Sequence, residues 1–159
     1  MTVTATQRLP WHDKYNEPDF EELRAHYTNP QALALLDQAR ARLQKFDGIE
    51  EQLTWQGMPW RWCLAYTKEG DPTAALAFLV PDPERASIAC PLIPDMLRSM
   101  PAHRCKKHLK DVLLLANLVD GVYWPTFELT SKAQTEDVLD LIRRKFDFVI
   151  GKAKVREDS

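Results

Sequence analysis

Apolar and polar positions alternate in short runs between Trp55 and Pro91, and turn-forming residues separate these runs. In one run every second residue carries a large apolar side chain, namely Trp60, Trp62, Leu64 and Tyr66. Successive side chains of a strand point to opposite faces, so this pattern predicts a strand with these four side chains on one face. Glycine and proline interrupt the runs at 56–57, 69–72 and 81–83, as is typical of turns. The stretch therefore predicts a meander of short strands.

Five strands are predicted along the chain: Ile49–Trp55, Trp60–Thr67, Thr73–Val80, Ala86–Pro91 and Val122–Leu129. The third of these is apolar at both odd and even positions, which favours a central strand covered on both faces. Pro125 interrupts the fifth. Because proline has no N–H to donate, we expect that strand to lie at an edge or to carry a bulge.

A period near 3.6 residues predicts helices on both sides of this block. The first is short and carries Phe20, Leu23 and Tyr27, and the second starts at the cap Asn29 and ends by Gly48. A single helical turn follows Pro94. A longer helix is expected over 102–121, and a last one runs from a cap at Ser131 or Thr135 to Gly151.

The predicted order is α-α-β-β-β-β-α-β-α. Strands in a block joined by short turns favour an antiparallel sheet. We therefore predict an α+β fold with two layers: an antiparallel five-stranded meandering sheet with helices packed mainly on one face. The expected division is an N-terminal arm and short helix over 1–22, a single α+β domain over 23–151 and a frayed tail over 152–159. Trp11 in the arm is expected to lie against the domain or against a second copy.

Composition changes this picture little. The chain has 159 residues, of which 45% are hydrophobic and 28% charged, an ordinary globular balance. A formal net charge of −2 creates no overall field for nucleic acid or an anionic membrane. No apolar run approaches the roughly 20 residues of a membrane span, and three scattered cysteines suit a reducing compartment. The expectation is a cytoplasmic protein without nucleic-acid or membrane partners.

Five aromatic residues form the first candidate site. They are Trp55, Trp60, Trp62, Tyr66 and Trp124. Indole and phenol groups combine a large apolar area with a polar atom, so these rings are tentative binding residues for a small apolar ligand or a peptide. Aromatic residues at alternating strand positions are first of all packing residues, so the same rings also suit a layer between sheet and helices or the interface of a homodimer. The sequence leaves these alternatives open.

A second candidate is the basic cluster over 103–108. His103, Cys105 and His108 are potential ligands for iron or zinc, and the last two are three residues apart on one side of a helix. Cys105 beside these histidines also allows a nucleophilic thiol. Neighbouring lysines disfavour a divalent cation, however, and further ligands have to come from elsewhere in the chain. A metal carrier or an enzyme is therefore the alternative hypothesis.

Other catalytic signatures are not evident in the sequence. The five glycines are isolated, so no glycine-rich phosphate loop is present. Paired carboxylates such as Glu50–Glu51 fall at helix starts or on exposed strand positions. We expect no catalytic residue and no cofactor, and we favour a non-enzymatic domain that binds a ligand or partner.

Several motifs together suggest a relationship to a known family. These are Trp55 and Gly57 before Trp60 and Trp62, the following Leu64-Ala65-Tyr66, the strand end Leu79-Val80-Pro81, Ala116-Asn117 with Gly121, and Glu136-Asp137-Val138 before Leu141–Lys145. Over Leu23 to Phe148 the chain resembles small bacterial domains of unknown function related to the YdhG-like proteins, which have a secretion-chaperone-like α/β fold. The resemblance implies an antiparallel sheet with flanking helices and no established catalytic residues. Some of these relatives are described as frataxin-like iron chaperones, a role that requires an acidic surface not identified in this sequence.

Overall fold

An antiparallel sheet of five strands forms the middle of the molecule, in the order β1-β2-β3-β4-β7. The strands are β1 (Ile49–Trp55), β2 (Trp62–Lys68), β3 (Asp71–Val80), β4 (Ser87–Ala89) and β7 (Thr126–Glu128). The structure, a computed structural model, describes residues 9–57, 60–68, 71–99 and 106–158. The predicted α+β class with a five-stranded antiparallel sheet is confirmed, and β7 lies at an edge, as Pro125 led us to expect.

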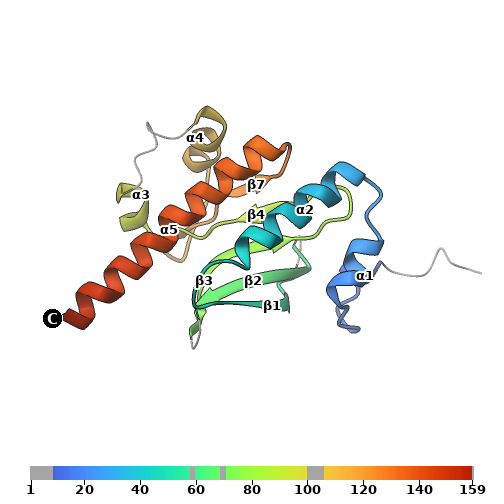
Figure 1. The fold of residues 1–159 in the computed structure, drawn as a ribbon, viewed down its shortest axis with the longest axis horizontal. Coiled ribbons are helices and arrows are strands. Elements are labelled where there is room, and N and C mark those ends of the chain that lie inside the picture. The colour runs from blue at the N-terminus through green and yellow to red at the C-terminus, as the bar shows by residue number, and fades with distance from the viewer. Residues whose placement is uncertain (1–8, 58–59, 69–70, 100–105, 159) are drawn as a thin grey trace, which may run out of the picture.

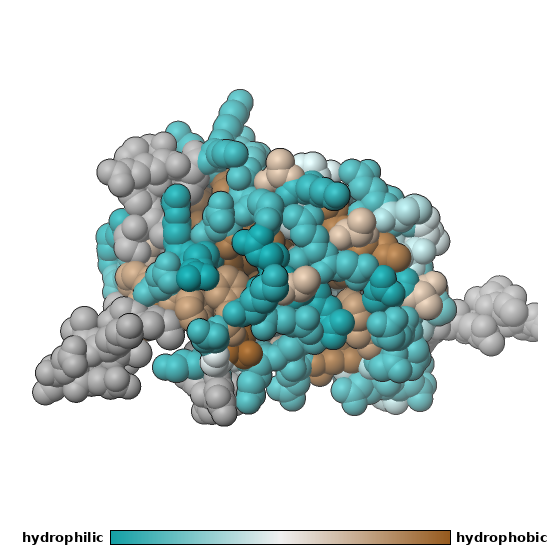
Figure 2. All heavy atoms as spheres, viewed as in Figure 1, coloured by the Kyte–Doolittle hydropathy of each residue, from teal (hydrophilic) through white to brown (hydrophobic). Residues whose placement is uncertain are grey.

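Helices precede, interrupt and follow the strands. They are a 3₁₀ turn η2 (Pro10–His12), α1 (Phe20–Ala25), α2 (Pro30–Leu43), α3 (Pro94–Ser99), α4 (Lys107–Leu114) and α5 (Lys132–Asp158). In Figure 1, α5 runs diagonally with α2 on one side and α3 and α4 on the other. The side of the molecule seen in Figure 2 is largely hydrophilic, and hydrophobic side chains show between the polar ones.

Local hydrogen bonds explain where the longer helices begin. The Asn29 side chain accepts hydrogen bonds from the backbone N–H groups of Gln31 and Ala32, which would otherwise lack partners in the first turn. Ser131 Oγ accepts from the backbone of Gln134 at 3.1 Å, so Ser131 rather than Thr135 caps α5. These caps were visible in the sequence because they depend only on neighbouring residues.

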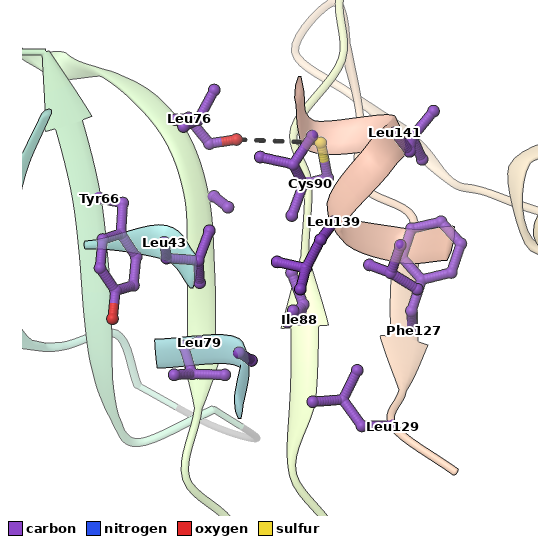
Figure 3. Packing of buried hydrophobic residues seen from close by; sticks show 14 of the residues in the cluster. Leu43, Tyr66, Leu76, Leu79, Ile88, Cys90, Phe127, Leu129, Leu139 and Leu141 are labelled. Atoms are coloured by element: carbon purple, nitrogen blue, oxygen red, sulfur yellow. Dashed lines mark hydrogen bonds between the residues drawn. The ribbon is translucent and has the colours of Figure 1, made fainter. Parts of the chain in front are cut away.

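The main core lies between α2, α4 and α5 and the face of the sheet that they cover. Leu64, Tyr66, Ala77 and Leu79 come from paired positions of β2 and β3 and point into it. Figure 3 shows Ile88, Cys90 and Phe127 from the neighbouring segments packed against Leu139 and Leu141 of α5. The opposite side of the sheet, which we call the far face, carries the other phase of the same strands, including Ala65 and Phe78.

Two helices have other bounds than the sequence predicted. The helix expected over 102–121 ends at Leu114 within its described part, and the chain then forms a hairpin from β5 (Leu118–Val119) and β6 (Val122–Tyr123). Asp120 and Gly121 have φ angles of 52° and 80°, which suit a tight hairpin turn rather than a helix end. The last helix continues past Gly151 to Asp158.

The N-terminal arm is fastened to the domain by two tryptophans. Trp11 Nε1 donates to the backbone oxygen of Trp62 at 3.0 Å, and Trp62 Nε1 donates to the backbone oxygen of Asp13 at 2.7 Å. Trp11 packs with Leu23 of α1 in a second buried cluster. Of the two expected locations for Trp11, the structure shows contact with the body of the domain.

No described helix has an apolar segment long enough to cross a membrane.

Candidate functional site

The backbone conformation at Arg61 places the Trp60 side chain on the opposite face of the sheet from Trp62. Trp60 and Trp62 are two residues apart and would share a face in a regular strand. However, β2 begins only at Trp62, and Arg61 has a φ of 58°, in the left-handed region that side chains other than glycine rarely adopt. The loop is closed by hydrogen bonds from Gln56 N to Arg61 O (2.8 Å) and from Arg61 N to Gly57 O (2.6 Å). The prediction that Trp60 shares a face with Trp62 and Tyr66 is therefore wrong.

Trp60 instead lies on the far face, where it forms what we call the aromatic layer with Phe78 and Trp124. The ring centroids are 5.6 Å apart for Trp60 and Phe78, 5.8 Å for Trp60 and Trp124, and 6.1 Å for Phe78 and Trp124. Each ring thus contacts the other two at tilted or edge-on angles, as aromatic rings prefer. Small side chains of the sheet, Ala65 and Ala89, lie beneath these rings and are buried.

The layer is only partly covered. Phe78 is 9% exposed, whereas Trp60 and Trp124 are half-buried. Among the residues that the structure describes, the members of this cluster come from the sheet and its loops, and none comes from a helix. The two indoles therefore form the outer surface of the far face at this point.

A buried thiol helps to hold the Trp60 loop. Cys63 Sγ lies 3.5 Å from the backbone oxygen of Trp60 and donates to it. Burial raises the pKa of Cys63 to about 12, so the thiol keeps its proton at neutral pH and remains a donor. Cys63 is therefore a packing residue in this structure and not a reactive nucleophile.

The other three predicted aromatic residues lie apart from this layer. Trp55 and Trp62 occupy paired positions of β1 and β2, with ring centroids 5.6 Å apart and beside the buried Trp11. Tyr66 is fully buried in the main core. The five candidates thus divide between two faces of the sheet: Trp60 lies beside Trp124 on the far face, and Trp55 lies beside Trp62 on the other.

Tyr66 belongs to a polar network that the sequence did not reveal. Its hydroxyl donates to Glu51 Oε2 at 2.6 Å, and Arg40 of α2 donates to both carboxylate oxygens, at 2.9 and 3.1 Å. Burial alone would raise the pKa of Glu51, but the hydrogen bonds from Arg40 and Tyr66 outweigh it and lower this pKa. The network joins α2 to β1 and β2, and its carboxylate is fully engaged, which suits a structural role.

Lys145 is a second buried polar group that sequence reasoning missed. It is 3% exposed, and its Nζ donates to the backbone oxygens of Ala75 (2.8 Å), Leu76 (3.0 Å) and Pro91. Burial lowers the pKa of Lys145. One signal was present in the sequence: Lys145 is seven residues after Val138, so it falls on the apolar stripe of α5.

The basic cluster is only partly described. His103 and Cys105 lie outside the described residues. His108 Nε2 lies 3.3 Å from Asp137 Oδ2, and Lys106 Nζ lies 3.1 Å from the other oxygen, so this part of the cluster ties α4 to α5. Across the described part of the chain, His, Cys, Asp and Glu side chains do not gather in the groups of three that hold a metal ion. The metal or enzyme hypothesis for His103, Cys105 and His108 stays a prediction.

Comparisons with protein-family profiles, with characterised proteins and with solved structures found no match to this chain. The resemblance to the YdhG-like proteins therefore stays a prediction, and the geometry of the described residues has to carry the functional argument.

Proposed function

We propose that this chain is a non-enzymatic binding domain and that the aromatic layer on the far face is its ligand surface. One observation carries the proposal: two half-buried indoles, Trp60 and Trp124, lie side by side over buried alanines, and the apolar residues of this cluster come from the sheet and its loops. Neighbouring apolar side chains that stay partly exposed often mark a ligand or partner surface. The proposed ligand is a flat apolar group, carried by a small molecule or by a peptide side chain.

The shape of the layer suits such a group. The three rings are tilted against one another by 38° to 60°, so they present both ring faces and ring edges. A planar apolar ligand gains contact with a ring face and with the alanine surface below it, while an indole N–H supplies a polar contact. The expected affinity is modest, because a shallow surface covers only one side of its ligand.

Backbone conformation at the same loop supports a binding role. Arg61 holds a left-handed conformation that costs about 1 kcal/mol or more for a residue with a side chain. Such costs are found most often at binding and catalytic sites, where the conformation aims a side chain. Here the conformation at Arg61 aims Trp60 at the far face.

An NMR titration tests the proposal. Indole, quinoline and naphthalene are added in turn to ¹⁵N-labelled protein while the indole N–H signals are followed. We expect the signals of Trp60 and Trp124 to shift in a saturable manner with at least one of these compounds. The indoles of Trp11 and Trp62 serve as internal references, because each already donates to a backbone oxygen.

A pair of variants supplies the control. Trp124→Ala removes one wall of the aromatic layer and is expected to weaken binding by roughly tenfold. Trp55→Ala removes another half-buried tryptophan from the opposite side of the sheet and should leave the affinity unchanged. Equal losses in both variants, or shifts confined to Trp55, would show that the ligand binds elsewhere.

A further inference from the structure

Four exposed aliphatic side chains occur within six residues, where α4 gives way to the β5–β6 hairpin. Leu114 is 65% exposed, Leu115 81%, Leu118 55% and Val119 52%. We call these four residues the apolar tip. Among the described residues, the only other large hydrophobic side chains classed as exposed are Leu9 and Tyr15, near the N-terminus. So many exposed aliphatic groups within six residues indicate a contact surface rather than scattered surface residues.

Helix α4, which leads into the apolar tip, is packed firmly against the domain. Leu109 and Leu113, on the inner side of α4, are 4% and 6% exposed and belong to the main core. Lys106 and His108 connect the start of α4 to Asp137 of α5. Helix α4 already packs its inward side on the main core, so Leu114 and Leu115 are exposed in addition to a fully packed face.

The hairpin ends in an open strand edge. β5 pairs with β6 through Leu118 with Tyr123 and Val119 with Val122. On its other side, β6 is bridged to Leu92. In the described structure β5 is thus the outermost strand, and its second edge offers backbone groups for pairing beside apolar side chains.

The charges around the tip decide which partner fits. Lys107 and Lys110 lie on α4 with Asp111, and Asp120 lies in the hairpin turn; Lys110 is partly exposed and the other three are exposed. Two positive and two negative groups therefore border the apolar centre. These charges sum to zero, so the border gives no net attraction to an anionic bilayer, and a highly charged protein would meet both signs. A second copy of this chain, related by a twofold axis, can place each sign against its opposite.

We propose that the apolar tip is the surface through which two copies of this chain associate, with the open edges of their β5 strands paired antiparallel about a twofold axis. The leucines and Val119 of both copies form the apolar centre, and the lysines and aspartates form the rim. The contact is small, so the dimer is weak and depends on protein concentration. This inference is independent of the proposed ligand surface.

Sedimentation velocity on the full chain over a wide concentration range tests the proposal. The wild type is expected to shift from monomer toward dimer as concentration rises. Leu115→Asp places a charge in the apolar centre and should raise the dimer dissociation constant by roughly tenfold or more. Tyr15→Asp is the matched control, since Tyr15 is 82% exposed but lies at the N-terminus, and it should leave association unchanged.

A second variant tests the charge argument separately. Asp111→Lys/Asp120→Asn leaves the aliphatic side chains in place and makes the rim wholly positive, and asparagine tolerates the positive φ at position 120. Its dimer should be weaker than the wild type at low salt and should recover at high salt, because salt screens the repulsion between the rims. Circular dichroism of each variant is the check that it remains folded.

Three results would overturn the proposal. One is a wild type that stays monomeric at every concentration. Another is an equal effect of Leu115→Asp and Tyr15→Asp, which would place the contact elsewhere. The third is binding of the wild-type monomer to phosphatidylserine vesicles that Leu115→Asp abolishes, because the tip would then be a membrane contact instead.

Discussion

At the scale of the residue, the conformation of a single residue decides which aromatic side chains reach the surface and which are buried. Arg61 turns Trp60 away from Trp62 and toward the far face. Tyr66, which the sequence placed on the same face as Trp60, is fully buried and bound to Glu51. The candidate ligand surface therefore depends on one left-handed residue, which alternation of apolar positions along a strand does not reveal.

Lys145 provides a prediction at the same scale. Lys145→Met removes the ammonium that satisfies three buried backbone oxygens, so the free energy of unfolding should fall by about 2–4 kcal/mol. Chemical denaturation measures this change. Arg144→Met, at the exposed neighbouring position, is the control and should change stability by no more than about 0.5 kcal/mol. Similar losses in both variants would contradict a structural role for the Lys145 ammonium.

The same residue predicts a dependence on pH. Burial lowers the pKa of Lys145 in the folded chain below its ordinary value of 10.5. Between these two pKa values the unfolded chain binds more protons than the folded chain, so the free energy of unfolding increases with pH in that window. We expect the wild type to gain stability relative to Lys145→Met as pH rises toward 10.5. A difference that stays constant over this range would contradict the lowered pKa.

At the scale of the element, the Glu51 network ties α2 to the sheet. Glu51→Gln weakens the ion pair with Arg40 and the bond with Tyr66, and the expected loss of stability is about 1–3 kcal/mol at neutral pH. The neighbouring Glu50→Gln is the control, since Glu50 is exposed on the other side of β1. Thermal or chemical unfolding of the two variants measures the difference.

The lowered pKa of Glu51 also predicts how the free energy of unfolding changes with pH. The pKa of Glu51 is lower in the folded chain than its ordinary value of 4.5. Its contribution to stability is thus fully present above that value and is lost as pH falls through the lower folded-state pKa. The wild type should lose stability below about pH 4.5 more steeply than Glu51→Gln does. Parallel pH profiles would count against the ion pair as a stabilising link.

Most elements could be predicted from the sequence, for a physical reason. The strands from Ile49 to Val80 and the caps at Asn29 and Ser131 depend on alternation and on hydrogen bonds to nearby residues. The helix expected over 102–121 could not be delimited in this way, because its apolar spacing continues through Val119. Its end at Leu114 is followed by a local hairpin, in which the Trp124 N–H donates to the Asn117 backbone oxygen and β5 pairs with β6.

At the scale of the whole molecule, the sheet separates two surfaces with different exposure. Helices α2 and α5 cover one face (Figure 1). Tyr66 and Lys145 are buried on that side. The far face leaves the aromatic layer half-buried, and the hairpin beyond α4 carries the apolar tip. In the proposed arrangement the ligand surface is separate from the partner surface, because no residue of the tip belongs to the aromatic layer.

The most direct test of this account is a set of intermolecular nuclear Overhauser effects between the planar compound that binds best and the aromatic protons of the protein. The account predicts contacts from the bound compound to the rings of Trp60, Phe78 and Trp124, and none to Trp55 or Tyr66. Contacts to Trp55 alone, or to the leucines of the apolar tip, would contradict the assignment of the ligand surface to the far face.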